Sequence, residues 1–164
     1  MRQGVLASQY AEEKSGKGLT GLGGLPAYLD LLQAARLPQS IRAHVGLRED
    51  GQGYTDTQII VPLVLLNLAG GEAVEDVRIL EKDDGLCRVL RGVEHSWLPR
   101  KERWRQERRW RKKRQRTVPS ASAVQRYLSS FHDGEEEKQR LTHVAFIPRP
   151  NGALVGLGQV NGDL

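Results

Sequence analysis

The stretch TDTQIIVPLVLLNLAGG, residues 55–71, contains the longest apolar run of the chain. Thr55 and Gln58 have the spacing of a capping box, in which each side chain satisfies a backbone N–H group at the start of a helix. Pro62 lies about two turns into the segment and predicts a kink, and Gly70 with Gly71 predicts the end. Because apolar side chains occur on nearly every side, we expect this helix at the centre of the core.

The same segment does not predict a membrane anchor. Its apolar run at 59–69 is about half of the roughly 20 residues that a transmembrane helix needs. Residues 1–18 lack a long apolar stretch and contain two acidic side chains, so they are expected to form a flexible tail and not a signal peptide. The single cysteine, Cys87, excludes an internal disulfide and fits a reducing compartment. We therefore expect a cytoplasmic protein with no membrane partner.

Two helices are predicted before the central one. Apolar side chains at steps of three and four indicate an amphipathic helix that begins near Pro26; they are Leu25, Tyr28, Leu29, Leu32 and Ala35. A second, short helix is expected over 40–45, with Ser40 as its N-cap and Gly46 as its stop.

Further helices are predicted after the central one. Val74, Val77 and Leu80 recur at steps of three, and a short helix is expected from Asp84 to Leu90, before Gly92. Residues 121–131 show the clearest amphipathic pattern, with Val124, Tyr127, Leu128 and Phe131 on one face and Ser122 with Gln125 as a capping box. Residues 151–164 fit either a strand after an Asn-Gly turn or a weak helix capped by Asn151.

These patterns predict an all-α fold. We expect a flexible tail at 1–18, a small multi-helix domain at 19–132, and a linker with the start of a further segment at 133–164. At 164 residues the chain is long enough to bury a core of its own. The domain is expected to include a helix-turn-helix-like element and one long basic helix at about 99–116.

Basic residues are concentrated in that one segment. The run RKERWRQERRWRKKRQR, residues 100–116, contains eleven Lys or Arg and two Glu, a net charge of +9, whereas the whole chain carries +5. The remaining residues therefore sum to −4. Because such a density of like charge repels itself, the run favours a polyanionic partner such as nucleic acid. The alternative is a solvated helix without a ligand.

Nucleic-acid binding would give particular side chains defined roles. Lys and Arg neutralise phosphates, and short polar side chains at the start of the helix after Pro119 can reach phosphates or base edges. Trp104 and Trp110 either stack on bases or attach the basic helix to the body. The helix after Pro119 has an equally ordinary alternative, a core helix with a solvated polar face. The predicted DNA-binding residues are Arg100, Lys101, Arg103, Arg105, Arg108, Arg109, Arg111, Lys112, Lys113, Arg114, Arg116, Ser120, Ser122, Gln125 and Arg126.

Motifs for catalysis or metal binding are not expected in this chain. The four histidines are widely spaced, and no P-loop, dinucleotide fingerprint or nucleophile elbow occurs. Acidic residues do cluster at Glu72, Glu75, Asp76, Asp83 and Asp84. A carboxylate cluster of this kind can hold a metal, but a solvated surface that complements a helix dipole is the more ordinary interpretation.

The order of the motifs resembles a known family. The segments TGLGGLPAYLDLL (20–32), YTDTQIIVPLVLLNLAGGEAVEDVRILEKDDGL (54–86), WLPRKERW (97–104) and TVPSASAVQRYLSSFHD (117–133) follow one another in the chain. In this order they are similar to the N-terminal region of bacterial insertion-sequence transposases of the DDE superfamily. The similarity extends from about Leu19 to the end.

The resemblance implies a function and also a missing part. In that family the helical N-terminal region helps to bind the terminal inverted repeats of the element during DNA transposition. An RNase H-like domain follows, in which two Asp and one Glu hold divalent metals such as Mg for DNA cleavage and strand transfer. No carboxylate of this chain corresponds to that triad, so we expect a truncated transposase with no cofactor and no activity of its own.

The leading hypothesis is thus a module that binds double-stranded DNA at the nucleoid, with homo-oligomers possible together with the full-length transposase. An arginine-rich RNA-binding protein is the second hypothesis, because RKKRQR at 111–116 is similar to segments that fold on RNA. A non-catalytic adaptor whose basic segment meets an acidic protein is the third.

Overall fold

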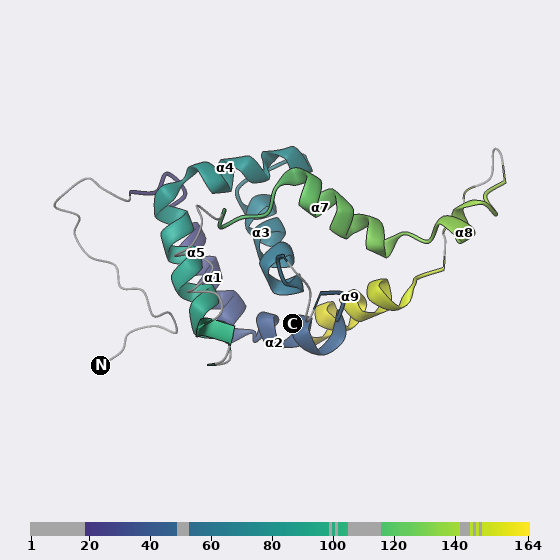
Figure 1. Cartoon of the computed structure of the whole chain (residues 1–164), viewed down its shortest axis with the longest axis horizontal. Helices are drawn as coiled ribbons and strands as arrows, with labels where there is room; N and C mark the ends of the chain where they lie inside the picture. The colour runs from purple at the N-terminus through teal and green to yellow at the C-terminus, as the bar shows by residue number, and fades with distance from the viewer. Residues whose placement is uncertain are drawn as a thin grey trace.

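The computed structural model describes residues 19–48, 53–98, 100, 102–104, 116–141, 145, 147 and 149–164. Within these residues every regular element is helical, as Figure 1 shows, so the predicted all-α class is confirmed. The elements are α1 (Leu25–Ala34), α2 (Leu37–His44), α3 (Asp56–Leu68), η1 (Val74–Asp76), α4 (Val77–Lys82), α5 (Asp84–Trp97), α7 (Ala121–Leu128), η2 (Ser129–Phe131), α8 (Gly134–Glu137) and α9 (Gly152–Asp163).

Helix α3 lies at the centre of the molecule, between α5 and α7 in Figure 1. Its capping box is confirmed: the Thr55 N–H donates to Gln58 Oε1 at 3.1 Å, and the Gln58 N–H donates to Thr55 Oγ1 at 3.3 Å. The predicted end is confirmed as well, because Gly70 has a left-handed φ of 79° and the Gly71 N–H donates to the Leu66 carbonyl. Of the helices described, none is both long and apolar enough to span a bilayer.

The main core forms where α1, α2, α4 and α5 pack around α3. Leu29, Ile41, Leu65, Leu80 and Leu90 have no exposed surface and belong to one apolar cluster. The predicted steps of three are confirmed at Val77 and Leu80, which are buried in α4, whereas Val74 is half-buried and belongs to the separate element η1. The predicted apolar face of α1 is right at Leu25 and Leu29 but wrong at Tyr28, which is 43% exposed.

Helix α5 is longer than predicted. The sequence suggested a stop before Gly92, whereas the helix continues to Trp97. Val93 and Trp97 extend the buried face of Leu86 and Leu90 at steps of three and four. Burying such side chains contributes roughly 1.5–3 kcal/mol each, which exceeds the cost of about 1 kcal/mol for glycine inside a helix.

Helix α2 begins earlier than predicted. Ser40 lies inside it and not at its N-cap, because Leu37 and Pro38 form the first turn and Arg36 caps it in the left-handed region at a φ of 57°. The predicted stop is confirmed, since α2 ends at His44 and Gly46 has a φ of 58°. Pro38 suits the first turn because its fixed φ is helical and its missing N–H is not needed there.

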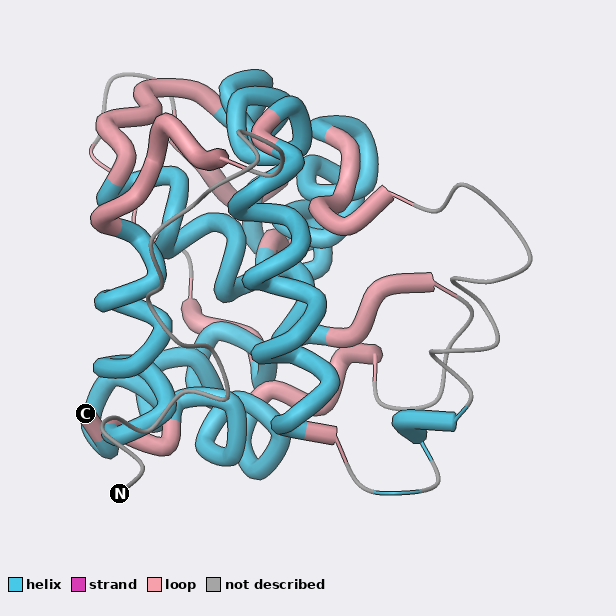
Figure 2. Tube along the Cα trace, turned by 90° about the vertical axis from the view of Figure 1, so that its left-hand side faces the viewer, coloured by secondary structure: helices cyan, strands magenta, loops and turns pink. Residues whose placement is uncertain are grey.

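The C-terminal residues add a second packing surface. Val124 and Tyr127 of α7 are buried against Ile59 of α3, and the Tyr127 and Phe131 rings meet edge to face with 5.4 Å between their centroids. Leu128 is exposed, so the predicted apolar face of 121–131 is narrower than expected. Figure 2, turned by 90° from Figure 1, shows the described elements as helices (cyan) joined by loops and turns (pink).

Residues 151–164 form a helix, α9, so the second of the two alternatives for this segment is confirmed. Asn151 caps it by accepting from the Leu154 N–H at 2.9 Å. Helix α9 packs on α2: Val160 enters the main core, and a Cβ atom at Gly156 would clash with the His44 carbonyl. Asp163 accepts a hydrogen bond from Ser40 Oγ at 2.5 Å and lies 3.0 Å from His44 Nε2. The segment expected as a linker at 133–164 thus supplies a helix to the core.

Candidate nucleic-acid interface

The basic run leaves the helical body directly after α5. Arg100 and residues 102–104 are helical and exposed, and Trp104 is 63% exposed. Arg103 Nε donates to the Leu98 carbonyl at 3.0 Å, so its guanidinium lies over the end of α5. The first described cations of the run are therefore at the surface, next to the body.

The run returns to the body at Arg116. Thr117 and Val118 are buried, and hydrogen bonds to the helical body hold the chain there. The Val118 N–H donates to Glu81 Oε2 at 2.7 Å, Arg91 Nε donates to Thr117 Oγ1 at 2.6 Å, and the Tyr54 hydroxyl donates to the Arg116 carbonyl at 3.0 Å. The return point is therefore a buried part of the body.

Both flanks of the run therefore contact the same helix. The first follows Trp97, and the second binds Arg91, six positions earlier in α5. Six residues correspond to about 9 Å along a helix axis. The run is thus attached to one region of the body at each end.

Much of the run itself lies outside the described residues. This applies to Lys101, Arg105, Arg108, Arg109, Arg111, Lys112, Lys113 and Arg114, and to Trp110. It also applies to most of the long helix expected at about 99–116, which stays a prediction. Of the described cations of the run, Arg116 is the one with a nearby acidic group, with 3.9 Å between its Nε atom and Glu81 Oε1.

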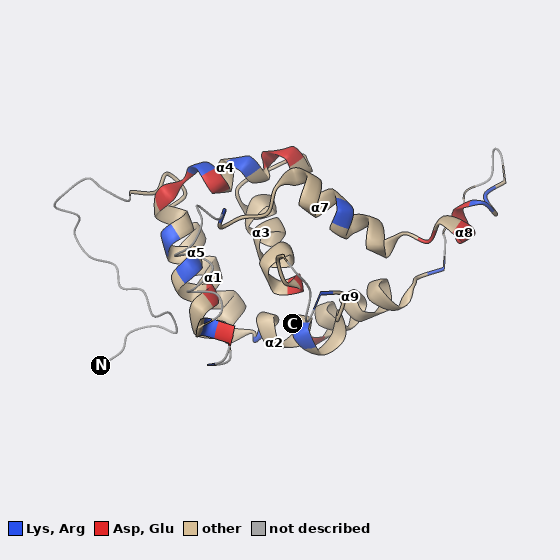
Figure 3. Cartoon of the chain, viewed as in Figure 1, with Lys and Arg blue, Asp and Glu red and all other residues tan. Residues whose placement is uncertain are grey.

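Helix α7 presents the polar residues that were predicted to contact DNA. Ser122, Gln125 and Arg126 are exposed on its outer face. Gln125 Nε2 donates to Glu75 Oε1 at 2.9 Å, and Arg126 Nε donates to the Ser122 carbonyl at 3.3 Å. Figure 3 shows a basic band on α7, acidic residues at α8, and acidic and basic residues alternating along α4. The helix-turn-helix-like role of α7 stays a prediction.

The N-cap of α7 differs from the predicted one. The capping box of Ser122 and Gln125 is wrong, because the chain at Ser120 is extended (φ −71°, ψ 155°) and Ser120 Oγ accepts from the Ala123 N–H at 3.2 Å. Ser122 lies inside the first turn, and Gln125 turns towards Glu75. Ser120 therefore already has a structural role, while Ser122 and Arg126 remain at the surface.

The acidic residues near α4 stabilise the backbone. Asp76 accepts from the N–H groups of Glu72 and Ala73, both at 3.1 Å, and Asp83 caps α5 at the Leu86 N–H at 2.8 Å. Burial alone would raise the pKa of Asp83, but hydrogen bonds from Leu86, Thr20 and Gly21 bring that pKa below its usual value. No group of three or more His, Cys, Asp or Glu side chains in the described ranges is placed to hold a metal ion.

The sequence did not predict a cavity that lies beside the start of the basic run. It lies at the start of α3 and the end of α5, and one of its walls contains Glu94, a carboxyl group that is almost fully buried. The sequence did contain a signal of this buried carboxyl group, since Glu94 lies four positions after Leu90 and three before Trp97, on the apolar stripe of α5.

In comparisons with known proteins, no family model matches the chain, and no curated protein or solved structure does either.

Proposed function

We propose that this chain is a DNA-binding module of a DDE-type insertion-sequence transposase, and that it carries none of the catalytic carboxylates. One observation supports the DNA-binding part above all: residues 100–116 carry a net charge of +9 in a chain whose other residues sum to −4. The transposase part depends on the order of the four motifs in the sequence.

Phosphate contacts would come from the basic run. Arg100 and Arg103 are exposed beside the end of α5, where they can meet a phosphate backbone without rearrangement of the core. Each neutralised phosphate releases condensed counterions, which supplies affinity that does not depend on base sequence. The same release offsets the mutual repulsion of the clustered cations.

Sequence readout would come from α7. Its exposed face carries Ser122, Gln125 and Arg126, and α7 follows the buried return point at Thr117 and Val118 after only two residues, Pro119 and Ser120. Short polar side chains on a helix of this kind can contact phosphates or base edges in the major groove. The buried return point would fix the position of that face relative to the basic run.

A salt titration tests the proposal. If about five basic side chains contact phosphates, the plot of log K for duplex DNA against log salt should have a slope of about −4 to −5. Fluorescence anisotropy with a labelled duplex measures this slope. Affinity that stays flat over the titration contradicts the proposal.

Replacement of Arg108, Arg109, Arg111 and Arg114 by Gln should abolish non-specific binding and leave the helix content measured by circular dichroism nearly unchanged. The matched control replaces Arg78, Lys82, Arg88 and Arg149 by Gln, four cations that are exposed on the described surface. This control removes the same charge and should retain most of the affinity. Equal losses in both variants would show that net charge alone, and not the run, determines binding.

Competition between a structured RNA and a duplex DNA of equal length separates the two nucleic-acid hypotheses. DNA should compete at least as well as RNA if α7 reads a duplex. Stronger competition by RNA would favour an arginine-rich RNA-binding protein instead.

A further inference from the structure

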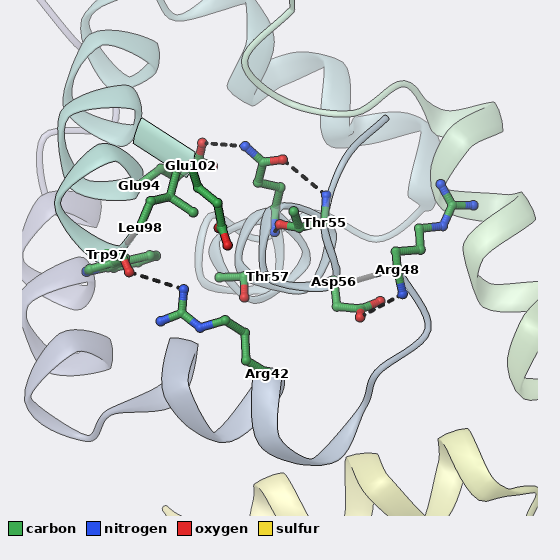
Figure 4. Close-up of a pocket in the computed structure, with 10 residues that line it drawn as sticks. Arg42, Arg48, Thr55, Asp56, Thr57, Glu94, Trp97, Leu98 and Glu102 are labelled. Atoms are coloured by element: carbon green, nitrogen blue, oxygen red, sulfur yellow. Dashed lines mark hydrogen bonds between the residues drawn. The ribbon is translucent and has the colours of Figure 1, made fainter. Parts of the chain in front are cut away.

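A cavity of about 270 Å³ lies between the end of α2, the start of α3 and the end of α5 (Figure 4). At about 30 Å³ per water molecule, this volume corresponds to roughly nine waters. It falls just below the roughly 300–1,000 Å³ of sites for drug-sized ligands. The cavity is thus too large for one water or metal ion and suits a small organic molecule.

Four buried side chains of the cavity wall have an atom without a hydrogen-bond partner among the described residues: Asp56 Oδ1, Thr57 Oγ1, Glu94 Oε1 and Trp97 Nε1. Glu94 is 4% exposed; its Oε2 atom accepts from Gln58 Nε2 at 3.2 Å, but its Oε1 atom has no partner among the described residues. Thr57 is 7% exposed, and its Oγ1 atom likewise has none in the described part of the chain. Because buried polar atoms in folded proteins are nearly always hydrogen-bonded, the unpartnered atoms of this wall indicate a ligand.

The charges around the cavity favour a cation. Three carboxyl groups line it, those of Asp56, Glu94 and Glu102. Two arginines, Arg42 and Arg48, line it as well, but both have other contacts. Arg42 Nη1 donates to the Trp97 carbonyl at 3.1 Å. Arg48 turns its guanidinium away from the cavity in Figure 4 and lies 5.6 Å from the centroid of the Tyr127 ring.

The wall formed by the end of α5 is largely apolar. Trp97 and Leu98 line the cavity on the side of α5. An aromatic wall next to carboxyl groups is a favourable environment for an organic cation, because both the ring and the carboxylates attract positive charge. A bare metal ion would gain no binding energy from apolar side chains of this kind.

We propose that this cavity binds a small organic cation, a primary amine or a guanidine with a short apolar body. Glu94 and Glu102 hold the charged group, Thr57 accepts one of its N–H bonds, and Trp97 with Leu98 contacts the apolar part. The proposal does not rest on DNA binding, although Glu102 belongs to the basic run.

Cation binding couples to the protonation of Glu94. Burial raises the pKa of Glu94 to about 8, although the hydrogen bond from Gln58 and the charge of Arg91 lower it again in part. The other charged groups around the cavity are Arg42 from α2, Arg48 after α2, Asp56 from α3, and Glu102 beyond α5. Since a cation is held by the ionised carboxylate, its affinity should rise tenfold or more, by order of magnitude, between about pH 6 and about pH 9.

The probes are n-butylamine and n-butylguanidine, with n-butanol and butyrate as neutral and anionic molecules of the same length. Heteronuclear NMR follows the Trp97 indole N–H and the backbone amides of 55–58 during each titration. Both cations should shift these signals in a saturable way, more tightly at the higher pH, and the alcohol and the acid should not. Binding of butyrate in place of the amines, or no saturable shift with any probe, overturns the proposal.

Four variants locate the binding site. Glu94→Gln keeps the size of the side chain and should weaken the amine at least tenfold, and Glu102→Gln should weaken it several-fold. The control Glu72→Gln removes the same charge from an exposed position outside the cavity and should bind like the original protein. If Glu94→Gln does not fold, Glu102→Gln and Thr57→Val decide: unchanged affinity in both overturns the proposal.

Discussion

Glu94 is a carboxylic acid placed where the neighbouring positions of α5 require apolar side chains. Its Oε2 atom is satisfied by Gln58, whose own Oε1 atom caps α3, so one amide group links the start of α3 to the buried face of α5. Burial raises the pKa of Glu94 to about 8, which keeps this side chain mainly neutral at neutral pH. The residue therefore makes the stability of the fold depend on pH.

Replacement of Glu94 by Gln should remove that dependence. The pKa of Glu94 is raised on folding, from 4.5 to about 8, so its contribution to stability is complete below the unfolded pKa and is lost as the pH rises through the folded one. In the range between these values Glu94→Gln should gain stability relative to the original protein, by a few kcal/mol in order of magnitude near pH 8. Urea unfolding across this pH range measures the difference. Parallel pH profiles for the two proteins would contradict it.

Ser120 and Ser122 provide a matched pair on α7. Ser120 caps the helix through the Ala123 N–H, whereas Ser122 is exposed inside the first turn. Ser120→Ala should lower the free energy of unfolding by about 1 kcal/mol, and Ser122→Ala should leave it nearly unchanged. If Ser122 contacts DNA, its replacement should weaken DNA binding only. Thermal unfolding and anisotropy measured on the same two variants separate the two roles.

At the scale of elements, α9 and α2 approach each other more closely than side chains usually allow. A Cβ atom at Gly156 would clash with the backbone of His44, while the position of Gly158 on the same helix is open. The two glycines therefore have different effects. Gly156 permits the close contact between the helices, whereas Gly158 only lowers the helix propensity of α9.

The two glycines should respond in opposite directions. Gly158→Ala should raise the free energy of unfolding by about 0.5–1 kcal/mol, since alanine is the better helix former. Gly156→Ala should lower it by roughly 1–3 kcal/mol, because overpacking pushes α9 off α2. Denaturant unfolding compares them directly. A stabilised Gly156→Ala variant would mean that α9 does not pack on α2 through this position.

Sequence patterns predicted best those helices whose start and end are determined by residues close in the sequence. The capping box of Thr55 and Gln58 and the Gly70 stop define α3, and both are visible within a few positions of the chain. The start of α2 was missed because Arg36 adopts a left-handed φ that its residue type does not suggest. The extension of α5 past Gly92 was missed because the burial of Val93 and Trp97 is decided by packing against other helices.

The candidate sites were less predictable than the helices. The charge of residues 100–116 is read from composition alone, but the return point at Thr117 and Val118 requires Glu81 and Arg91, which lie far away in the sequence. The cavity was not foreseen at all, since it joins the start of α3 to the end of α5. Only the carboxyl group of Glu94 on an apolar stripe pointed to it.

At the scale of the whole molecule, the net charge is divided along the sequence, with +9 in residues 100–116 and −4 in the other residues. The basic run joins the body at α5 and at the buried Val118, so DNA that binds the run would also restrain the core to which it is attached. Binding to the folded chain and unfolding of the core should therefore be coupled.

Duplex DNA should protect the fold against heat. A ligand at 100 times its dissociation constant adds about 2.7 kcal/mol to the free energy of unfolding when it binds the folded state alone. Differential scanning fluorimetry with increasing DNA should show a rising Tm that is lost at high salt. The variant with Gln at 108, 109, 111 and 114 should show no rise, and an equal rise there would place the DNA elsewhere.

The chain returns to the body at Thr117 and Val118, so the basic run lies between two portions of the chain that both belong to the folded core. Residues after the basic run supply Val118 and Val160 to the main core and Tyr127 to the second cluster. The portions before and after the run are thus complementary halves of one folding unit, and neither is an appendage of the other. A single peptide-bond cut between Arg100 and Arg116 would leave two pieces that remain associated without a covalent link.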